Sequence, residues 1–419
     1  MLISSMYSRF CLVLILTALP NVTRAAEAHT AVSPRNALEE RLLADAADGD
    51  LDELTLIEAA LIAASIADEK EVASYVARYQ TLLVDLDGQC AALPAEARVR
   101  TAFRVLHQRI LTGAYDAHCS SLRTTLDDGR FNCVSATILF HAMCVHVGLQ
   151  PQTVSTPDHV FSQLDLAGIG DIQTTCANWL DSPRAVERTG HSPADDVVSR
   201  RLLTPVQLLG KVYYNTGVEL LQSGDFAAAV AALQVSVRLD KDDCVARDNL
   251  LAGWNNWSLA EEDAGRLPRA AELVERGLRW EPSYAPLLAN DLHIHQRWAL
   301  QLCDDGRYEQ ALQLLQRCHA RRPEARLFDL GRVAVVALWS ESLFRLGQFE
   351  EAFRVFDDAQ RMLAGSAGWD ECEEALICRS VASLMRKGSR AQALQLCTRG
   401  IERLPESARL LRQHRDLTQ

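Results

Sequence analysis

The chain has 419 residues, of which 48% are apolar and 23% charged, and its formal net charge is -12. This length exceeds the usual size of a single hydrophobic core, so we expect two or more domains. The composition is typical of a folded protein and excludes a disordered chain or a polytopic membrane protein. The negative charge argues against a nucleic-acid partner.

The first residues predict a secretory signal, which we assign to residues 1–25. Arg9 precedes an apolar run over residues 10–19, and Pro20 and small residues around Ala25 follow it. The run is too short to cross a bilayer comfortably as a helix. We therefore expect an exported protein, periplasmic or extracellular, that touches a membrane only through an uncleaved signal.

The twelve cysteines are scattered at irregular spacing and include no CxxC pair. This is not the dense framework of a small disulfide-stapled domain, and it does not match a zinc-ligand pattern. We therefore expect no metal site and no cofactor, and we interpret most cysteines as small buried residues.

Two segments with different sequence patterns precede the C-terminal half. Over residues 36–111 apolar residues recur every three or four positions, which predicts a helical segment that packs on the next domain. Residues 112–182 form that domain. We expect one helix there, beginning near Asn132 and stopping at Gly148, and then three strands. The strands are expected at residues 152–156, 160–166 and 169–175. Residues 183–202 are interpreted as a connector.

Residues 203–419 form an array of five repeats with a strict period of 41 residues. Chance does not keep one period over five copies. The period is carried by three sets of residues: Gly224, Gly265, Gly306, Gly347 and Gly388; Ala229, Ala270, Ala311, Ala352 and Ala393; and Trp257, Trp298 and Trp339.

Each copy is expected to form two antiparallel helices. Glycine suits the turn between them, and a small alanine five residues later allows the helices to cross closely. Arg390 replaces the large apolar residue that other copies have two positions after the glycine, so we expect the last copy to be a cap.

The first copy resembles the tetratricopeptide repeat at its small and large positions, Gly217, Leu220, Ala229, Leu233 and Ser236. That repeat has about 34 residues. The additional residues amount to about two helical turns, which favours a longer first helix. A loop of the same length is the alternative.

A stack of such repeats has a groove lined by the first helices, where a protein or peptide partner could bind. Six residues occupy positions that usually face this groove: Tyr214, Asn215, Asn255, Asn256, Gln296 and Arg297. Their amide and guanidinium groups suit an extended peptide or a carboxylate. Hydrogen bonds between helices are the alternative role.

The middle segment contains residues that could form a thiol-based catalytic site. Cys133 is expected at the start of a helix, where the helix dipole favours a thiolate. His159 opens a predicted strand, and Asp171 follows in Asp-Ile-Gln-Thr-Thr-Cys. Cys133 as nucleophile, His159 as base and Asp171 as orienting acid would form a triad.

The sequence motifs around these residues resemble those of the transglutaminase-like superfamily. They are Phe-Asn-Cys-Val-Ser-Ala-Thr before an apolar helix, Pro-Asp-His before a strand, and then Asp-Ile-Gln-Thr-Thr-Cys. The whole chain is similar to exported bacterial proteins that join such a domain to tetratricopeptide repeats. The resemblance implies an α+β, papain-like fold with Cys133, His159 and Asp171 as the catalytic residues. Asp158 and Gln173 depart from the pattern, which usually has Gly and Glu there.

Two functions are therefore expected. The first is an exported cysteine-dependent peptidase or acyl transferase that acts on peptide-like substrates of the cell envelope, with an all-α repeat solenoid that binds protein or peptide. The alternative is a catalytically silent interaction scaffold built from the same parts.

Overall fold

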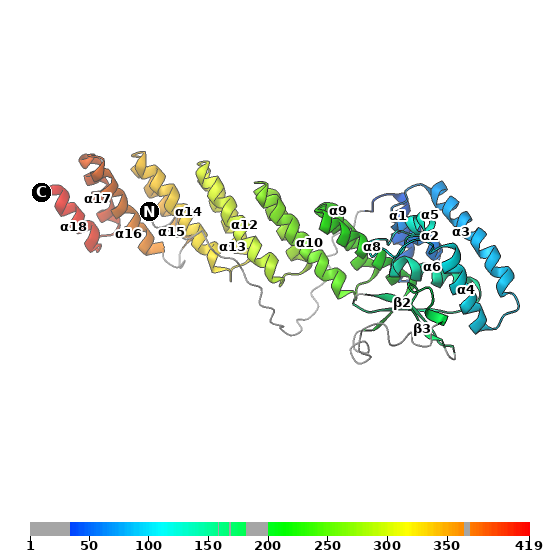
Figure 1. Cartoon of the computed structure of the whole chain (residues 1–419). Helices are drawn as coiled ribbons and strands as arrows, with labels where there is room; N and C mark the ends of the chain where they lie inside the picture. The colour runs from blue at the N-terminus through cyan, green and yellow to red at the C-terminus, as the bar shows by residue number, and fades with distance from the viewer. Residues whose placement is uncertain (1–33, 158, 167–168, 182–199, 364–368) are drawn as a thin grey trace. The chain divides into compact units, whose positions relative to one another are not determined.

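The computed structural model describes residues 34–157, 159–166, 169–181, 200–363 and 369–419 (Figure 1). The predicted signal at residues 1–25 and most of the predicted connector at 183–202 lie outside the described residues. Export and the signal therefore stay predictions. Within the described part of the chain, no helix combines the length and apolarity needed to cross a membrane.

Six helices precede the sheet in the described chain. The last of them is apolar on all sides, and Ile138, Leu139 and Phe140 within it are fully buried. It begins beside an asparagine N-cap and ends before Gly148, which has a positive φ of 75°. The helices are α1 (Ala37–Asp45), α2 (Leu56–Ala63), α3 (Glu69–Cys90), α4 (Ala95–Arg109), α5 (Leu122–Asp128) and α6 (Cys133–His146), with a short 3-10 turn at Ala46–Asp48.

The sheet has four short antiparallel strands in the order β3-β2-β1-β4. They are β1 (Gln152–Ser155), β2 (Val160–Leu164), β3 (Gly170–Ile172) and β4 (Arg201–Leu203). Val154 lies opposite Phe161 in the β1–β2 pair, and Thr153 lies opposite Leu203 in the β1–β4 pair. Sequence analysis missed β4, whose residues were assigned to the end of the connector and the start of the repeat array, because a strand of three residues has too little periodic signal.

The prediction of a papain-like α+β domain is wrong. The described residues are predominantly helical, and the sheet is limited to four strands of three to five residues. The core that surrounds α6 is built mainly from helices, and it includes the first helix of the repeat array through Val206, Leu208, Leu209, Val212 and Tyr213. The strands thus form a small addition to a helical protein.

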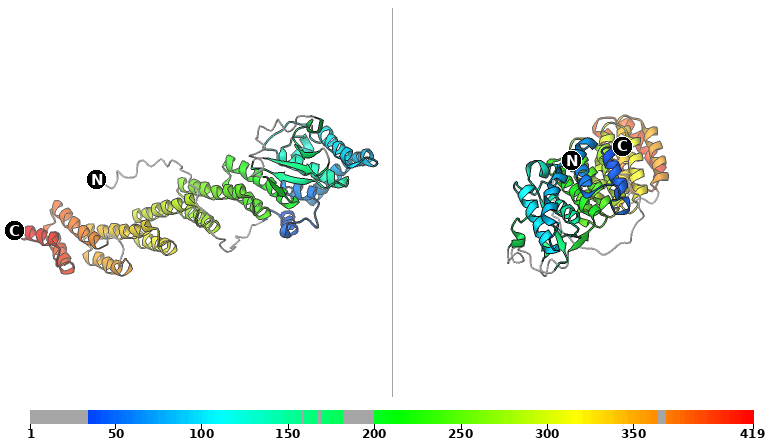
Figure 2. Two further views of the ribbon diagram at one scale, coloured as in Figure 1. Left: turned by 90° about the horizontal axis from the view of Figure 1, so that it is seen from below. Right: turned by 90° about the vertical axis from the view of Figure 1, so that its right-hand side faces the viewer.

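The prediction of tetratricopeptide-like repeats is confirmed. Successive helix pairs stack side by side along the C-terminal part of the chain, as Figures 1 and 2 show. The helices are α8 (Pro205–Ser223), α9 (Phe226–Leu239), α10 (Cys244–Asp263), α11 (Leu267–Trp280), α12 (Ala285–Asp304), α13 (Tyr308–Arg321), α14 (Arg326–Arg345), α15 (Phe349–Met362), α16 (Trp369–Arg386), α17 (Arg390–Arg403) and α18 (Ala408–Thr418).

The small residues of the repeat are explained by close backbone approach. Gly224 ends α8 with a positive φ of 81°, a conformation that glycine adopts without strain. A Cβ on Gly217 would lie 2.5 Å from Leu233 Cγ, so only glycine fits where α8 crosses α9. The periodic alanines, from Ala229 to Ala393, are fully buried at the equivalent crossings.

The additional residues of each repeat lengthen its first helix. The first helices α10, α12 and α14 have 20 residues each, whereas the second helices α11, α13 and α15 have 14. At the C-terminal end, the Arg390 guanidinium donates two hydrogen bonds to the carbonyl of Leu417, near the end of α18. Arg390 therefore binds one of the orphan carbonyl groups at that helix end.

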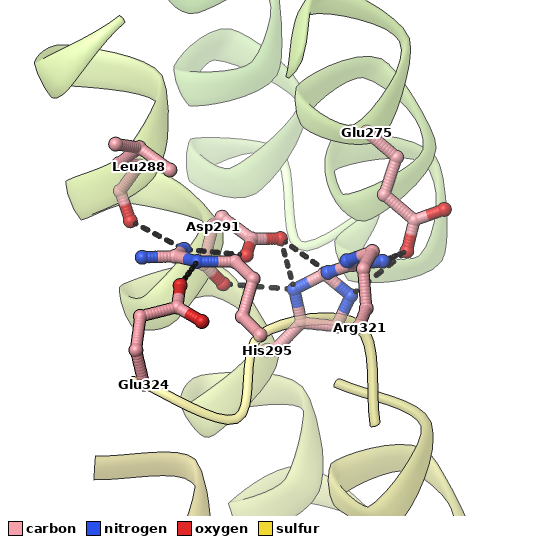
Figure 3. Close-up of polar contacts among 7 residues, drawn as sticks. Glu275, Leu288, Asp291, His295, Arg321 and Glu324 are labelled. Atoms are coloured by element: carbon pink, nitrogen blue, oxygen red, sulfur yellow. Dashed lines mark hydrogen bonds and ion pairs between the residues drawn. The ribbon is translucent and has the colours of Figure 1, made fainter. Parts of the chain in front are cut away.

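A buried ionic cluster joins the second and third repeats (Figure 3). Asp291 on α12 is fully buried, and its carboxylate accepts hydrogen bonds from Arg321 Nη2 at 2.7 Å and Arg322 Nη1 at 2.8 Å. His295, one turn later, contacts both Asp291 and Glu275 of α11. The cluster thus connects α11, α12 and the end of α13 at one point.

Candidate functional site

A cavity of about 330 Å³ lies between α6, the β1–β2 turn and the repeat helix α8. Five of the lining residues belong to α8, so the first repeat helps to shape this site. The lining consists of Ala117, His118, Cys133, Val134, Thr156, Pro157, His159, Val160, Lys211, Tyr214, Asn215, Val218 and Glu219. The structure therefore brings the predicted residues Cys133, His159, Tyr214 and Asn215 to one cavity.

Cys133 is the first residue of α6, as the sequence predicted for this helix start. The side-chain oxygen of Asn132 accepts hydrogen bonds from the backbone N–H groups of Val134 and Ser135 at 2.9 and 3.0 Å. The Asn132 N–H in turn donates to Ser135 Oγ at 3.1 Å. This reciprocal cap fixes the first turn of α6 and holds the half-buried Cys133 at the cavity.

Ser120 connects the helix cap to the repeat array. Its hydroxyl oxygen accepts one hydrogen bond from Asn132 Nδ2 and another from Asn215 Nδ2, each at 2.7 Å. Asn132 Nδ2 also donates to the carbonyl of Ala117 at 3.1 Å. Asn215, which was predicted to bind a ligand, therefore joins α8 to the loop before α5.

His159 lies just before β2, and its partner is Gln173. The two side chains are 2.6 Å apart, between His159 Nε2 and Gln173 Oε1. An amide oxygen only accepts, so Nε2 donates this hydrogen bond and only Nδ1 is left to accept a further proton. The imidazole also stacks on Phe161, with ring centroids 6.0 Å apart.

Asp171 does not contact His159. Its carboxylate accepts hydrogen bonds from Gln163 Nε2 at 2.8 Å and from the guanidinium of Arg200 at 2.8 and 3.0 Å. The strand register explains this choice, because Asp171 lies directly opposite Gln163 in the β2–β3 pair. The predicted orienting acid is thus used within the sheet, and the neutral Gln173 stands beside His159 instead.

Three ionisable residues at the cavity, Lys211, Glu219 and His118, were missed by sequence analysis. Lys211 Nζ is 2.7 Å from Asp243 Oδ2, which balances its buried charge. Glu219 Oε1 lies 4.0 Å from His118 Nδ1, and burial is the main cause that raises the pKa of Glu219. Lys211 and Val218 are spaced by three or four residues from Tyr214 and Asn215, so helical periodicity could have identified this wall.

The other predicted groove residues bond from one first helix to the next. Asn290 Nδ2 donates to Asn255 Oδ1 at 2.7 Å, Arg297 Nη1 donates to Glu262 Oε1 at 2.8 Å, and Gln296 Nε2 donates to the carbonyl of Leu327 at 3.4 Å. The alternative role considered for these residues therefore applies to Asn255, Gln296 and Arg297. Asn256 is exposed and accepts a 3.4 Å bond from its neighbour Asn255.

One exposed position recurs along the first helices, and we call it the first-helix row. Its members are separated by 41 residues and come from α10, α12, α14 and α16. Each of these helices contacts the next one in this series. Leu338 in this row is 38% exposed although it is a large apolar residue. The first-helix row consists of Asn256, Arg297, Leu338 and Arg379.

No family model matches the chain, and no curated protein matches it. Solved structures do match. A tetratricopeptide repeat protein, YrrB, whose structure is described as having an unusual peptide-binding site, is 16% identical with a TM-score of 0.17 and covers 48% of this chain and 89% of its own. The tetratricopeptide domain of P58(IPK) is 13% identical with a TM-score of 0.18 and covers 91% of this chain and 92% of its own.

Because both TM-scores are low, we assign the class of protein from the helices and the 41-residue repeat period of this chain itself. The described helices define a tetratricopeptide-like helical repeat protein. Among the described residues, no group of three or more His, Cys, Asp or Glu side chains is arranged to hold a metal ion.

Proposed function

We propose that this protein is a helical-repeat scaffold that binds an extended segment of a partner protein along the first-helix row. The observation that carries the proposal is the row itself: neighbouring first helices each present one exposed side chain at the same position of the repeat. An apolar member, Leu338, lies among polar ones. Binding surfaces commonly combine an apolar anchor with polar neighbours in this way.

The dimensions of the row suit an extended chain. Packed helices lie about 8–10 Å apart, and an extended peptide advances about 3.3 Å per residue. A bound segment would therefore meet a new member of the row about every three residues. The polar members supply amide and guanidinium groups that can bond to peptide carbonyl groups or carboxylates.

A library of random peptides displayed on phage, selected against the purified chain, tests this proposal. Selected peptides are then titrated against the wild-type protein, Leu338→Glu and the control Leu346→Glu. Leu346 is 72% exposed just beyond the end of α14 and does not belong to the first-helix row. Burying a new carboxylate against a peptide opposes binding, so we expect Leu338→Glu to weaken it at least about tenfold.

The control variant should bind with the wild-type affinity. The scaffold proposal fails if no peptide is enriched. It also fails if the selected peptides bind Leu338→Glu as tightly as the wild-type protein.

A second candidate function, a thiol-dependent cleavage of amides, is supported by one observation: Cys133 and His159 line the same cavity. In this reaction Cys133 Sγ forms a bond to the amide carbonyl carbon while His159 takes the thiol proton. The carbon–nitrogen bond then breaks, and the proton goes to the departing amine. Water or another amine attacks the thioester, releases the acyl group and restores the thiol.

Alkylation by iodoacetamide at neutral pH tests this second function. We expect Cys133 to react faster than the exposed Cys176, and we expect His159→Asn to slow Cys133 alone. The proposal of thiol-dependent amide cleavage is wrong if Cys133 reacts no faster than Cys176, or if His159→Asn leaves both alkylation rates unchanged.

A further inference from the structure

A second cavity, of about 110 Å³, lies between the first helices of the last two repeats, α14 and α16. Its wall contains four basic side chains, one carboxylate and two hydroxyl groups. It is lined by Glu341, Phe344, Arg345, Arg379, Ser380, Ser383, Leu384, Arg386 and Lys387. Arg379 also belongs to the first-helix row, so the cavity opens on the proposed binding surface.

The basic side chains of this cavity make no ion pair with any described residue. Elsewhere in the array arginines are neutralised by nearby acids: Arg297 by Glu262, and Arg322 by Asp291. Arg345, Arg379, Arg386 and Lys387 are exposed, and none of them forms a salt bridge or a side-chain hydrogen bond within the described chain. Even Glu341 in the same wall is not in ion-pair contact with them.

The repeat period shows that the wall of this cavity has a small side chain where earlier copies have tryptophan. Trp257, Trp298 and Trp339 occupy one position of the repeat, and they are half-buried against the cores. In the last copy the residue at that position is Ser380. Serine is much smaller than an indole side chain, so this position of the last copy contributes little bulk to the cavity wall.

The period also shows a change of charge. One position near the end of the first helix holds Asp263 and Asp304 in the second and third copies, but Arg345 and Arg386 in the last two. A helix C-terminus stabilises cations, which accounts in part for arginines at this point. It does not account for Arg379, which lies two turns before the end of α16.

We propose that the cavity between α14 and α16 binds the carboxylates of an acidic segment of the partner protein. Four unpaired cations against one carboxylate attract anions, and planar guanidinium groups bind carboxylates with two parallel hydrogen bonds. The hydroxyl groups of Ser380 and Ser383 can donate further hydrogen bonds. This inference rests on the proposed scaffold function and adds the charge of the segment that is bound at the last two repeats.

Fluorescence anisotropy with a labelled oligoglutamate peptide, and with an oligoglutamine peptide of equal length, tests the inference on the full chain. The wild-type protein should bind oligoglutamate at least about tenfold more tightly than oligoglutamine, and added salt should weaken binding. The double variant Arg379→Gln/Arg386→Gln should lose about tenfold in affinity. Arg326 lies exposed at the opposite end of α14 and makes no ion pair with a described residue, so Arg326→Gln should bind like the wild-type protein.

A variant that restores the indole gives an independent readout. Ser380→Trp keeps every charge but fills the cavity, so we expect it to weaken oligoglutamate binding as well. Circular dichroism checks its folding, and if it unfolds, the arginine variants still decide the matter. Equal binding of the two peptides, or wild-type affinity in the double variant, would overturn the inference.

Failure here is distinguishable from failure of the scaffold function. If library peptides bind through Leu338 but oligoglutamate does not bind, the scaffold function is supported and the proposed preference for acidic segments is wrong. If oligoglutamate binding depends on Arg379 and Arg386 while the library yields no peptide, carboxylate binding by the cavity is supported and peptide binding along the first-helix row is wrong.

Discussion

The imidazole of His295 lies 3.1 Å from the carboxylate of Asp291, one turn earlier on α12, and both side chains are buried. The pKa of His295 reflects this pair. Burial alone would lower it, but hydrogen bonds, first of all to Asp291, raise it to about 11. The charged groups that face the imidazole come from three helices: Asp291 on α12, Glu275 on α11 and Arg321 on α13.

Stability should therefore fall as the pH rises. In the unfolded chain the pKa of His295 returns to its ordinary value of 6.5. The stabilisation from protonated His295 is fully present below that pH, decreases above it and is lost as the pH passes about 11. We expect the difference in unfolding free energy between wild type and His295→Gln to shrink between neutral pH and pH about 10 in urea titrations. A difference that is constant over this window would contradict the assignment.

Asp291→Asn should destabilise the array strongly. The substitution leaves the guanidinium groups of Arg321 and Arg322 without the buried carboxylate that both contact. Removing one partner of a buried ion pair costs about 3–5 kcal/mol. Asp304→Asn, at the exposed end of the same helix, should change the unfolding free energy by less than about 0.5 kcal/mol. Equal effects of the two substitutions in denaturant titrations would show that the cluster is not structural.

Gly217→Ala should destabilise although alanine is the better helix former. The new Cβ would meet Leu233 Cγ at 2.5 Å and Leu233 Cδ2 at 2.9 Å. Overpacking of this kind costs about 1–3 kcal/mol. Gly88→Ala in α3 is the matched control, because its Cβ would meet no atom within 4 Å. Thermal unfolding should show a gain of about 0.5–1 kcal/mol for the control, and a gain for Gly217→Ala would contradict the close crossing.

Ser120→Ala should weaken the connection between the helix cap and the first repeat. The hydroxyl accepts hydrogen bonds from both Asn132 and Asn215, and its loss leaves two amide donors unsatisfied. The expected cost is about 1–3 kcal/mol. Hydrogen exchange should then accelerate at the start of α6 and in α8. Ser223→Ala, at the exposed end of α8, should leave exchange unchanged. Unchanged exchange in Ser120→Ala as well would contradict this role.

Local sterics made part of the structure predictable from sequence. The 41-residue spacing of Gly224 and Ala229 with their counterparts reports turns and helix crossings, which depend on residues within one repeat. The start of α6 was likewise predictable, because Asn132 caps its own helix. The positions of Tyr214 and Asn215 within the repeat predicted that they face a binding groove, and the structure places both at the first cavity.

Long-range packing could not be predicted in this way. The core around α6 includes Val206 and Tyr213 of the first repeat, and no local pattern indicates that two segments share a core. Asp171 was predicted to orient His159 because a carboxylate orients histidine well, but strand register directs Asp171 to Gln163 and Arg200. The prediction of a papain-like fold was wrong because it depended on a few short sequence motifs, whereas the apolar periodicity of the preceding residues indicated helices.

Site-specific photocrosslinking tests the central claim, that one segment runs along the first-helix row, most directly. A photoreactive residue is placed in turn at Asn256, Arg297, Leu338 and Arg379, and at Gln313, which is exposed on the second helix α13. With a peptide selected from the library, the row positions should crosslink to successive points of the peptide, about three residues apart, and Gln313 should not crosslink. Crosslinks from Gln313, or from all row positions to one point of the peptide, would contradict the account.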